Sequence, residues 1–428
     1  MKVKHLIGVI GLGLVTSVGT TAQAQTIQEA IRTAINSHPE VSAAKHEVLA
    51  REQEIKGAKA GYLPTVDVAA GFGKEDTKSP TTGQQDVSLD RTETSISARQ
   101  LVFDGFATRS EVKRQEARTQ SARHEVESTS ENIALRTAEV YLSLLTQADL
   151  LKLAEASLQE HKSIYDQMTL RNQSGVGSRA DLDQIAARLA LAESNVVVAQ
   201  ANLMDAVTNY YRVTGVMPEV EALSMPSNNI DLPANLEDAV ELALQSHPTL
   251  KTANADIDAT IAQAEAAKAP FWPDVRLEAD ASWNEDTGGV VGEDERQVIA
   301  LRMRYNLYRG GADKARRKQT HYLLEESKDV RNNTSRQVVE GLRLSWTAFE
   351  SVSSQLQYLQ AHVDAAQATK QAYINQFNIG RRTLLDLLNT ENEVVDAKRN
   401  LIRASYNQKL TEYRIYNSMG LLLQKLAI

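Results

Sequence analysis

The sequence predicts an α+β membrane protein that is built from two copies of one structural unit. Three observations support this prediction: segments in which apolar and polar residues alternate, two very long stretches without proline, and a repeat that pairs the two halves of the chain. Alternation with a period of two is typical of a half-buried β-strand, and a long stretch without breakers favours a helix. The length of 428 residues would allow two or three domains.

The first 24 residues have the pattern of a secretory signal peptide. Lys2 and Lys4 precede an apolar stretch at 6–18, and a small-residue cleavage site follows at 22–24. We therefore expect residues 1–24 to be removed on export. Beyond residue 18 there is no apolar run of about 18 residues, so no membrane-spanning helix is expected.

Composition excludes several classes of function. The chain contains no cysteine, which rules out disulfides, thiolate nucleophiles, thiolate metal sites and a lipid-modified N-terminal cysteine. Its formal net charge of −8 argues against nucleic-acid binding, because proteins that bind nucleic acids present a basic face. No nucleophile, metal cluster or phosphate-binding loop stands out, so we expect neither an enzyme nor a cofactor.

The two halves of the chain repeat each other. Residues 27–30 (IQEA) and 37–40 (SHPE) recur 209 positions later as LEDA and SHPT. From Phe103 onward the offset is 205, as in the pair Gly175 and Gly380. The four-residue difference therefore lies between 64 and 103, where we expect a hairpin loop, because loops tolerate insertions. The predicted repeats are 25–217 and 235–428, with a linker at 218–234.

Each repeat opens with a helix that is broken at a His-Pro pair. Proline suits the first turn of a helix, and the residue before it avoids helical geometry. His38 and His247 occupy equivalent places at these breaks. No cysteine or cluster of carboxylates accompanies them in the sequence, so we interpret both histidines as structural.

A β-hairpin follows in each repeat, at 64–104 and at 273–309. Apolar residues at 275, 277, 279, 281 and 283 alternate with polar ones, and the pattern recurs at 299–306 and more weakly at 66–72 and 92–101. Polar loops are expected at about 74–90 and 284–294. Aromatic residues near the strand ends are compatible with an interfacial belt: Tyr62, Phe103, Phe271, Trp272 and Tyr308. Four strands cannot close a barrel in lipid, so the sheet is either soluble or completed by other chains.

A long helical hairpin ends each repeat, at 106–215 and 311–420. Residues 106–172 contain neither proline nor glycine, and 312–378 contain only Gly341. A helix of this size is roughly 100 Å long. Its narrow apolar stripes fit the wall of a hollow helical cylinder or a plain coiled coil. The basic cluster Lys314, Arg316, Arg317 and Lys318 is interpreted as a solvated helix face.

The duplicated strand-helix order resembles that of the TolC-like outer-membrane export ducts, over residues 25–428. The matching segments are 37–40 (SHPE), 62–67 (YLPTVD), 101–105 (LVFDG) and 379–388 (IGRRTLLDLL). The resemblance implies a homotrimer in the outer membrane of a Gram-negative bacterium, with a 12-stranded β-barrel (four strands per chain) and a periplasmic α-helical barrel. It also implies a passive duct without a cofactor. The partners would be a periplasmic adaptor (membrane fusion) protein, an inner-membrane ABC transporter or proton-driven pump, and outer-membrane lipid.

The resemblance further implies a gate at the periplasmic tip. Asp386 occupies the acidic gate position, Arg382 the basic link position and Phe377 the place of a linking aromatic, and Asp181 is the equivalent of Asp386 in the first repeat. The second acidic position falls on Asn389, which has no charge.

The helical turns at the tip are the implied contacts for the adaptor: Gly175, Gly177, Ser178, Gly380 and Thr383. Segments 178–181 and 383–386 also fit a capping box, in which an acidic residue helps to satisfy the first helical turn. Capping and gating are compatible roles for the two aspartates.

Two kinds of cargo remain open at this point. The form of the motifs and the absence of an anchor cysteine favour type I protein secretion, and drug or small-molecule efflux is the alternative. A structural coiled-coil protein of the periplasm or cell surface is the competing interpretation from another class. The alternating strands, which are apolar on one face, favour the duct.

Overall fold

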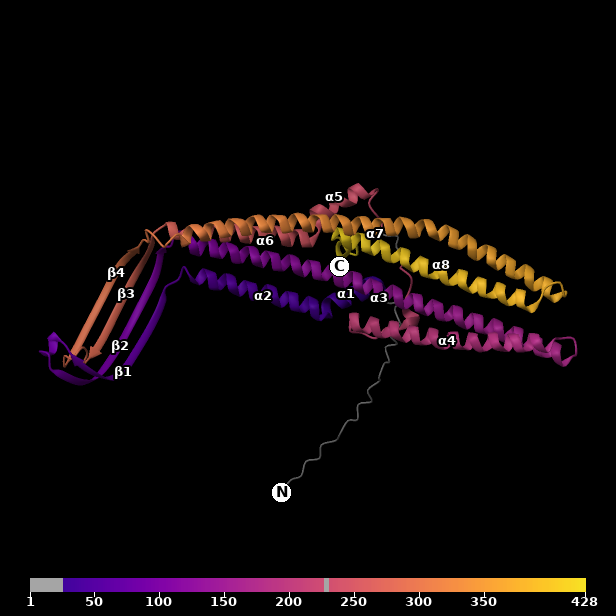
Figure 1. Ribbon diagram of the computed structural model, residues 1–428, viewed down its shortest axis with the longest axis horizontal. Coiled ribbons are helices and arrows are strands. Elements are labelled where there is room, and N and C mark those ends of the chain that lie inside the picture. The colour runs from indigo at the N-terminus through magenta and orange to yellow at the C-terminus, as the bar shows by residue number, and fades with distance from the viewer. Residues whose placement is uncertain (1–25, 227–230) are drawn as a thin grey trace, which may run out of the picture.

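The computed structural model describes residues 26–226 and 231–428, so the predicted signal peptide at 1–24 lies outside the described residues. The molecule is strongly elongated (Figure 1). A β-sheet forms one end, the turns of two helical hairpins form the other, and several short helices lie near the middle.

The order of the elements confirms the predicted repeat. The first half contains α1 (Ile27–Ser37), α2 (Pro39–Ala60), β1 (Thr65–Lys78), β2 (Asp86–Phe103), α3 (Ala107–Gln173) and α4 (Arg179–Thr214). The second half contains α5 (Leu236–Ser246), α6 (Pro248–Ala266), β3 (Asp274–Glu285), β4 (Glu293–Arg304), α7 (Ala312–Asn378), α8 (Leu384–Met419) and α9 (Leu422–Lys425). Short 3-10 turns lie at Pro80–Thr82, Val220–Ala222 and Ala269–Phe271.

The two histidines, interpreted from the sequence as structural, cap the helices that follow them. His38 Nδ1 accepts a hydrogen bond from the backbone N–H of Glu40 at 3.2 Å, and His247 Nδ1 accepts one from Thr249 at 3.2 Å. The following proline occupies the first helical turn in both cases. Burial lowers the pKa of His247, which keeps its ring neutral and able to accept this hydrogen bond.

The four strands form one antiparallel sheet in the order β1-β2-β3-β4. β1 pairs with β2 from Thr65 opposite Arg99 to Lys78 opposite Asp86. The strands are longer than predicted, because the expected loops at 74–90 and 284–294 shrink to 79–85 and 286–292. Polar and charged residues fill the added ends at 74–78, 284–285 and 293–294, so apolar periodicity could not detect those ends.

One face of the sheet is apolar and exposed. Phe72 and Ile299 are each 81% exposed, and Val68 and Leu301 are also largely exposed. The opposite face contains ion pairs between strands, such as Arg302 with Glu278 at 2.7 Å. The outer edges of β1 and β4 have no partner strand among the described residues. The sheet is therefore open on both sides within one chain.

The long helices confirm the predicted helical hairpins. α3 and α7 each have 67 residues, and the returning helices α4 and α8 each have 36. In the part of the chain that the structure describes, no helix combines the length and the apolarity needed to cross a membrane. The largest apolar cluster lies at mid-length, where α1, α5 and α9 pack on α3, α7 and α8 around Tyr141, Tyr210, Leu342 and Tyr413.

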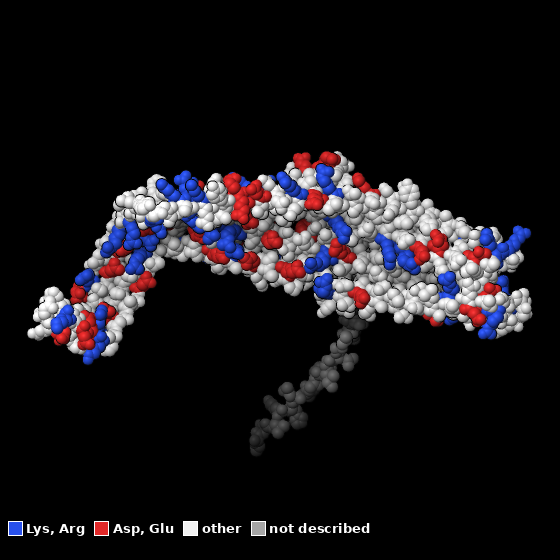
Figure 2. All heavy atoms as spheres, in the orientation of Figure 1, with Lys and Arg blue, Asp and Glu red and all other residues white. Residues whose placement is uncertain are grey.

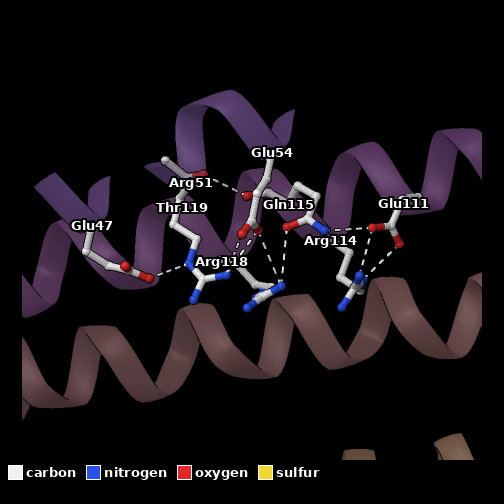
Figure 3. Close-up of polar contacts among 8 residues, drawn as sticks. All are labelled: Glu47, Arg51, Glu54, Glu111, Arg114, Gln115, Arg118 and Thr119. Carbon is white, nitrogen blue, oxygen red and sulfur yellow. Dashed lines mark hydrogen bonds and ion pairs between the residues drawn. The ribbon is translucent and has the colours of Figure 1, made fainter. Parts of the chain in front are cut away.

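A ladder of alternating charges joins α2 to α3 near the sheet (Figure 3). Arg51 of α2 contacts Glu47 at 2.7 Å and Glu54 at 3.0 Å, and Glu54 also lies 3.5 Å from Arg118 of α3. Further along α3, Arg114 and Glu111 form a pair at 2.7 Å. The hydrogen bond from Arg114 lowers the pKa of Glu111, so this carboxylate keeps its charge at neutral pH.

Candidate gate at the helical tips

The turn between α3 and α4 depends on two glycines. Gly175 has φ +74°, a left-handed conformation that glycine adopts without steric cost. A Cβ on Gly177 would meet the backbone nitrogen of Asn172 at 2.9 Å, so only glycine fits there. The N–H groups of Val176 and Gly177 both donate to the carbonyl of Arg171 at 3.0 Å. These bonds satisfy the end of α3 and leave Val176 83% exposed at the tip.

The turn between α7 and α8 has a related geometry. Gly380 has φ +76°, and the N–H of Arg381 donates to the carbonyl of Gln376 at 2.9 Å. Ile379 is 68% exposed beside it. Both tips therefore present an apolar side chain next to a glycine turn.

Only one of the two expected capping boxes forms. The N–H of Asp386 donates to Thr383 Oγ1 at 3.2 Å, and the N–H of Thr383 donates to Asp386 Oδ2 at 3.1 Å. In the first repeat Ser178 Oγ accepts from the N–H of Ala180 at 3.1 Å, so Ser178 caps α4 without Asp181. The box predicted at 178–181 is therefore wrong. The cap bonds to the nearer residue, which leaves the Asp181 carboxylate out of the turn.

Arg382 lies at the centre of a small polar cluster. Its Nη1 lies 4.0 Å from Asp386 Oδ2, and its Nε donates to Gln376 Oε1 at 3.0 Å. Its Cζ sits 4.3 Å from the centre of the Tyr373 ring, a cation–π contact. The pKa of Asp386 is lowered, first by the hydrogen bonds from Thr383 and further by Arg382. The carboxylate therefore remains charged at neutral pH.

Asp386 and Asn389 line the same groove between α7 and α8. The groove has a volume of about 490 Å³ and also includes Tyr373, Glu393 and His362. Glu393 lies two helical turns after Asp386, and its Oε1 is 2.7 Å from His362 Nε2. The second carboxylate of this face is thus at Glu393 rather than at Asn389. The seven-residue spacing from Asp386 could have indicated it.

Phe377 points into the interior of the molecule and does not contact Arg382. Its side chain is 8% exposed, and Arg171 Cζ lies 4.8 Å from the centre of its ring. It belongs to an apolar cluster that joins the two helical hairpins: Ile164, Met168, Ile185, Phe377, Leu384, Leu387 and Leu388. The aromatic ring in contact with Arg382 is that of Tyr373. The sequence could not show which of the two rings contacts Arg382, because both residues lie on the same helix, four residues apart.

Polar contacts that sequence reasoning missed also join the hairpins. Lys370 Nζ of α7 lies 2.5 Å from Glu391 of α8 and 3.3 Å from Glu160 of α3. Burial alone would lower the pKa of Lys370, but the bond with Glu391 and the two nearby carboxylates raise it. Closer to the middle of the molecule, Tyr406 Oη donates to Asp149 Oδ2 at 2.7 Å. The two hairpins are therefore linked along their length down to the tips.

These features define a class of protein. The sheet exposes an apolar face and open edges, and it continues into hairpins roughly 100 Å long that are tied together at their far end. A protein of this class is an outer-membrane channel with a long helical extension. The chain belongs to the family described as outer membrane efflux protein, whose model matches residues 30–216 and 239–421.

Relatives and solved structures agree with this assignment. The chain is 23% identical to the outer membrane efflux protein BepC of Brucella suis over 94% of the chain and 87% of that protein. It is 25% identical to the outer membrane protein TolC of Escherichia coli, with 96% and 85% covered, and 23% identical to the alkaline protease secretion protein AprF of Pseudomonas aeruginosa, with 87% and 80% covered. The fold is similar to that of CusC, with a TM-score of 0.81, 14% identity, and 92% of this chain and 91% of that chain covered.

The family gives the location and the general activity. The protein is an outer-membrane efflux channel of a Gram-negative bacterium, and channels of this family are non-enzymatic homotrimers that work in tripartite systems. Within the described residues no group of three histidine, aspartate or glutamate side chains is placed to hold a metal ion.

Proposed function

We propose that this protein is the passive outer-membrane duct of a type I protein secretion system. The similarity to AprF, a protein named for alkaline protease secretion, supports this cargo. The absence of cysteine also supports it, because no residue is available for the lipid modification considered for the efflux branch. Small-molecule efflux is the second candidate, favoured by the similarity to BepC.

The open sheet is the single observation that supports a duct most directly. Its unpaired edges on β1 and β4 and its exposed apolar face would be unstable in water and, as a lone sheet, in lipid. Joining β4 of one copy to β1 of the next removes every edge. Three copies of a four-stranded sheet would give a barrel of 12 strands, with the apolar face toward lipid.

The helical tips would form the periplasmic gate of this trimer. Three copies of Asp386 around the axis would repel one another and attract cations, so the shut gate would favour cation passage. Arg382 lies beside each Asp386 and partly neutralises it. The gate would open when the Arg382 cluster and the links at Lys370 and Phe377 separate.

The exposed ends of the tips would contact the adaptor. Val176 and Ile379 are exposed apolar residues that the turns at Gly175, Gly177 and Gly380 display, and the caps at Ser178 and Thr383 fix the helices behind them. An adaptor that binds both tips of a protomer could separate the hairpins. The energy for transport would come from an inner-membrane pump, which type I secretion implies to be an ABC transporter.

A secretion assay distinguishes the two cargoes. The chain would be expressed in a strain without its own duct, together with the ABC transporter and adaptor from its type I system. We expect the cognate protein substrate to appear in the medium and dye efflux to remain at the background level. Restored dye efflux without protein secretion would contradict the proposed cargo and retain the duct. A monomer that is soluble without detergent would contradict the duct itself and favour a structural coiled-coil protein.

A further inference from the structure

Basic residues gather at the end of the helical body next to the sheet. Two grooves lie there, one of about 510 Å³ between α3 and α6 and one of about 640 Å³ between α6 and α7. Both are lined by Glu265 and Lys268, so they adjoin each other. We call their six basic side chains the basic collar: Arg109, Lys113, Lys268, Lys314, Arg317 and Lys318. Figure 2 shows basic side chains gathered at this end of the helices.

The basic collar contains more positive charge than its neighbours neutralise. Only two carboxylates, Asp258 and Glu265, line the same grooves. Glu265 pairs with Lys268 at 2.7 Å, and no carboxylate of the described residues forms an ion pair with the other five cations. The whole chain has a net charge of −8, so this local excess of positive charge is opposite in sign to the charge of the whole protein.

The ladder on α2 and α3 provides a contrast within the same region. There, Arg51, Arg114 and Arg118 each lie within 3.5 Å of a glutamate, as the dashed lines of Figure 3 show. Arg118 joins α2 to α3, and all three arginines are already paired with glutamates, so none has free charge to offer. The cations of the basic collar do not join elements in this way, so the fold alone does not explain them.

Lys314 and Arg317 of the collar occupy the same heptad positions as the α7 residues that support α5. Lys314 and His321 precede Leu342 by whole heptads, and Arg317 precedes Val338 by three heptads. Val338 and Leu342 belong to the apolar cluster that includes α5. A helix on the inner side of a tunnel would obstruct it, so this face is the outer side of the wall, and this step rests on the proposed function.

Aromatic side chains close each groove on the side of the sheet. Phe106 and Trp272 line the first groove and Phe271 lines the second, and all three are 40–54% exposed. Phe103 packs edge-to-face against Phe106 and Trp272, which fixes their positions. Aromatic rings at this height are typical of the boundary between lipid tails and headgroups. Each groove is therefore apolar toward the membrane and cationic toward the periplasm.

We propose that the basic collar binds the phosphate groups of anionic phospholipids in the periplasmic leaflet of the outer membrane. Lysine and arginine can place their apolar stems along the lipid and direct their charges to the headgroups. Arginine donates two hydrogen bonds to a phosphate, and lysine acts as a point charge. The collar thus fixes the depth of the sheet in the membrane. The cluster 314–318 is a ligand site and not merely the solvated face that the sequence favours.

The test compares lipid binding by variants with matched charge. The collar variant is Lys314→Gln, Arg317→Gln and Lys318→Gln. The control is Lys162→Gln, Arg212→Gln and Arg403→Gln, which removes three exposed cations from helices away from the sheet and outside any described ion pair. Binding of phosphatidylglycerol and phosphatidylcholine to the purified detergent-solubilised trimer would be measured by native mass spectrometry, and the salt dependence by thermal shift.

We expect the wild-type trimer and the control to prefer phosphatidylglycerol and the collar variant to bind it about 100-fold more weakly, since each cation near an anionic surface contributes to binding. Equal binding of the two lipids by the wild type would overturn the proposal. So would an equal loss in the control, or complete competition by inorganic phosphate, which would identify free phosphate as the ligand. Failure of the collar variant to form trimers would assign these residues to a subunit contact and overturn it as well.

A second variant guards against misfolding of the first. Arg109→Gln with Lys113→Gln changes the other groove on α3 and should also lose the preference for phosphatidylglycerol. Conductance of both variants in bilayers of neutral lipid should equal that of the wild type. A wild-type protein that does not conduct would contradict the proposed duct. Unchanged lipid binding in both variants would contradict the basic collar and leave the duct intact.

Discussion

Arg382 is the residue whose replacement tests the gate with least damage to the fold. It contacts Asp386, Tyr373 and Gln376 by its side chain only and caps no helix. We expect Arg382→Ala to raise the conductance of the closed channel in planar bilayers, about two-fold or more, because a small polar link is lost while the turn stays intact. Unchanged conductance and ion selectivity would remove Arg382 from the gate.

Thr383 separates capping from gating. Thr383→Ala removes the hydroxyl that accepts from the N–H of Asp386 and leaves Arg382 and the carboxylate in place. Loss of an N-cap typically costs about 1 kcal/mol of stability. We expect a lower Tm with little change in closed-state conductance. A conductance as high as that of Arg382→Ala would mean that the cap, and not the charge of Arg382, keeps the tip shut.

The buried Glu131, in the middle of the molecule, should make the stability of the protein depend on pH. Its carboxylate is 6% exposed and accepts hydrogen bonds from the N–H groups of Leu422 and Leu423 at 3.1 and 3.0 Å. Burial raises its pKa to about 7, and the two hydrogen bonds offset this only in part. The folded state therefore binds this proton more tightly than the unfolded state, so stability falls as pH rises from the usual glutamate pKa toward 7.

The measurement is Tm between pH 5 and pH 8 for the wild type and Glu131→Gln. Across this interval the free energy of unfolding of the wild type should fall by on the order of 3 kcal/mol because of Glu131 alone. Glutamine does not titrate, so the variant should show a flatter profile. Parallel profiles would mean that Glu131 is ionised throughout, with its two amide bonds outweighing burial.

At the scale of elements, the two repeats allow a direct comparison of the glycines that end their long helical hairpins. Gly215 and Gly420 end α4 and α8 with φ of +75° and +69°. A Cβ on Gly215 would meet only Ser37 Oγ, at 3.9 Å, whereas one on Gly420 would meet Pro248 Cδ at 2.3 Å and His247 Cα at 2.8 Å. The second hairpin is thus packed closely against the break between α5 and α6.

Alanine at these two positions should therefore have unequal effects. Gly215→Ala should cost about 1–2 kcal/mol, the strain of a left-handed residue. Gly420→Ala adds a backbone clash that moves α8 away from His247, so its loss of Tm should be at least twice as large. If the two variants lost the same amount of Tm, the break between α5 and α6 would be able to move aside without lowering stability.

The sequence predicted elements well wherever one local pattern decided the outcome. The absence of breakers set the bounds of α3 and α7 to within one residue at each end, and the His-Pro pairs set the starts of α2 and α6. The ends of β1 and β4 could not be predicted, because residues such as Lys74 and Glu293 follow no apolar alternation, whereas Val87 and Leu89 at the start of β2 do alternate and were missed. Cross-strand pairing extends those strands, and it is a property of the sheet as a whole.

The candidate gate was less predictable than the fold, for a related reason. The positions of Arg382 and Asp386 beside a glycine turn follow from local sequence. The choice of Tyr373 over Phe377 as the partner of Arg382 depends on which face of α7 meets α3. Lys370 likewise meets Glu160 across 210 residues of chain, a contact that only the packing of the two hairpins creates.

At the scale of the whole molecule, the two halves of the helical wall are joined in the same way as the two halves of the sheet. Within one chain, β2 pairs with β3 and connects the repeats, and α3 packs against α6 in the same way. The chain is thus continuous across its centre and open at its lateral edges. Closure of the assembly requires β1 of one copy to meet β4 of another.

The absence of cysteine makes this closure directly testable. One cysteine would replace Val68 on β1, and a second would replace Gln297, Ile299, Leu301 or Met303 in turn on β4, because the register between copies is to be found by the scan. We expect at least one pair to form disulfides only between chains and to give a covalent trimer on a denaturing gel. The control pair Ile96→Cys and Ala281→Cys joins paired neighbours on β2 and β3 and should bond within one chain. If every β1–β4 pair stayed monomeric while the control oxidised, the edges would not meet, and the open sheet would need another partner to cover it.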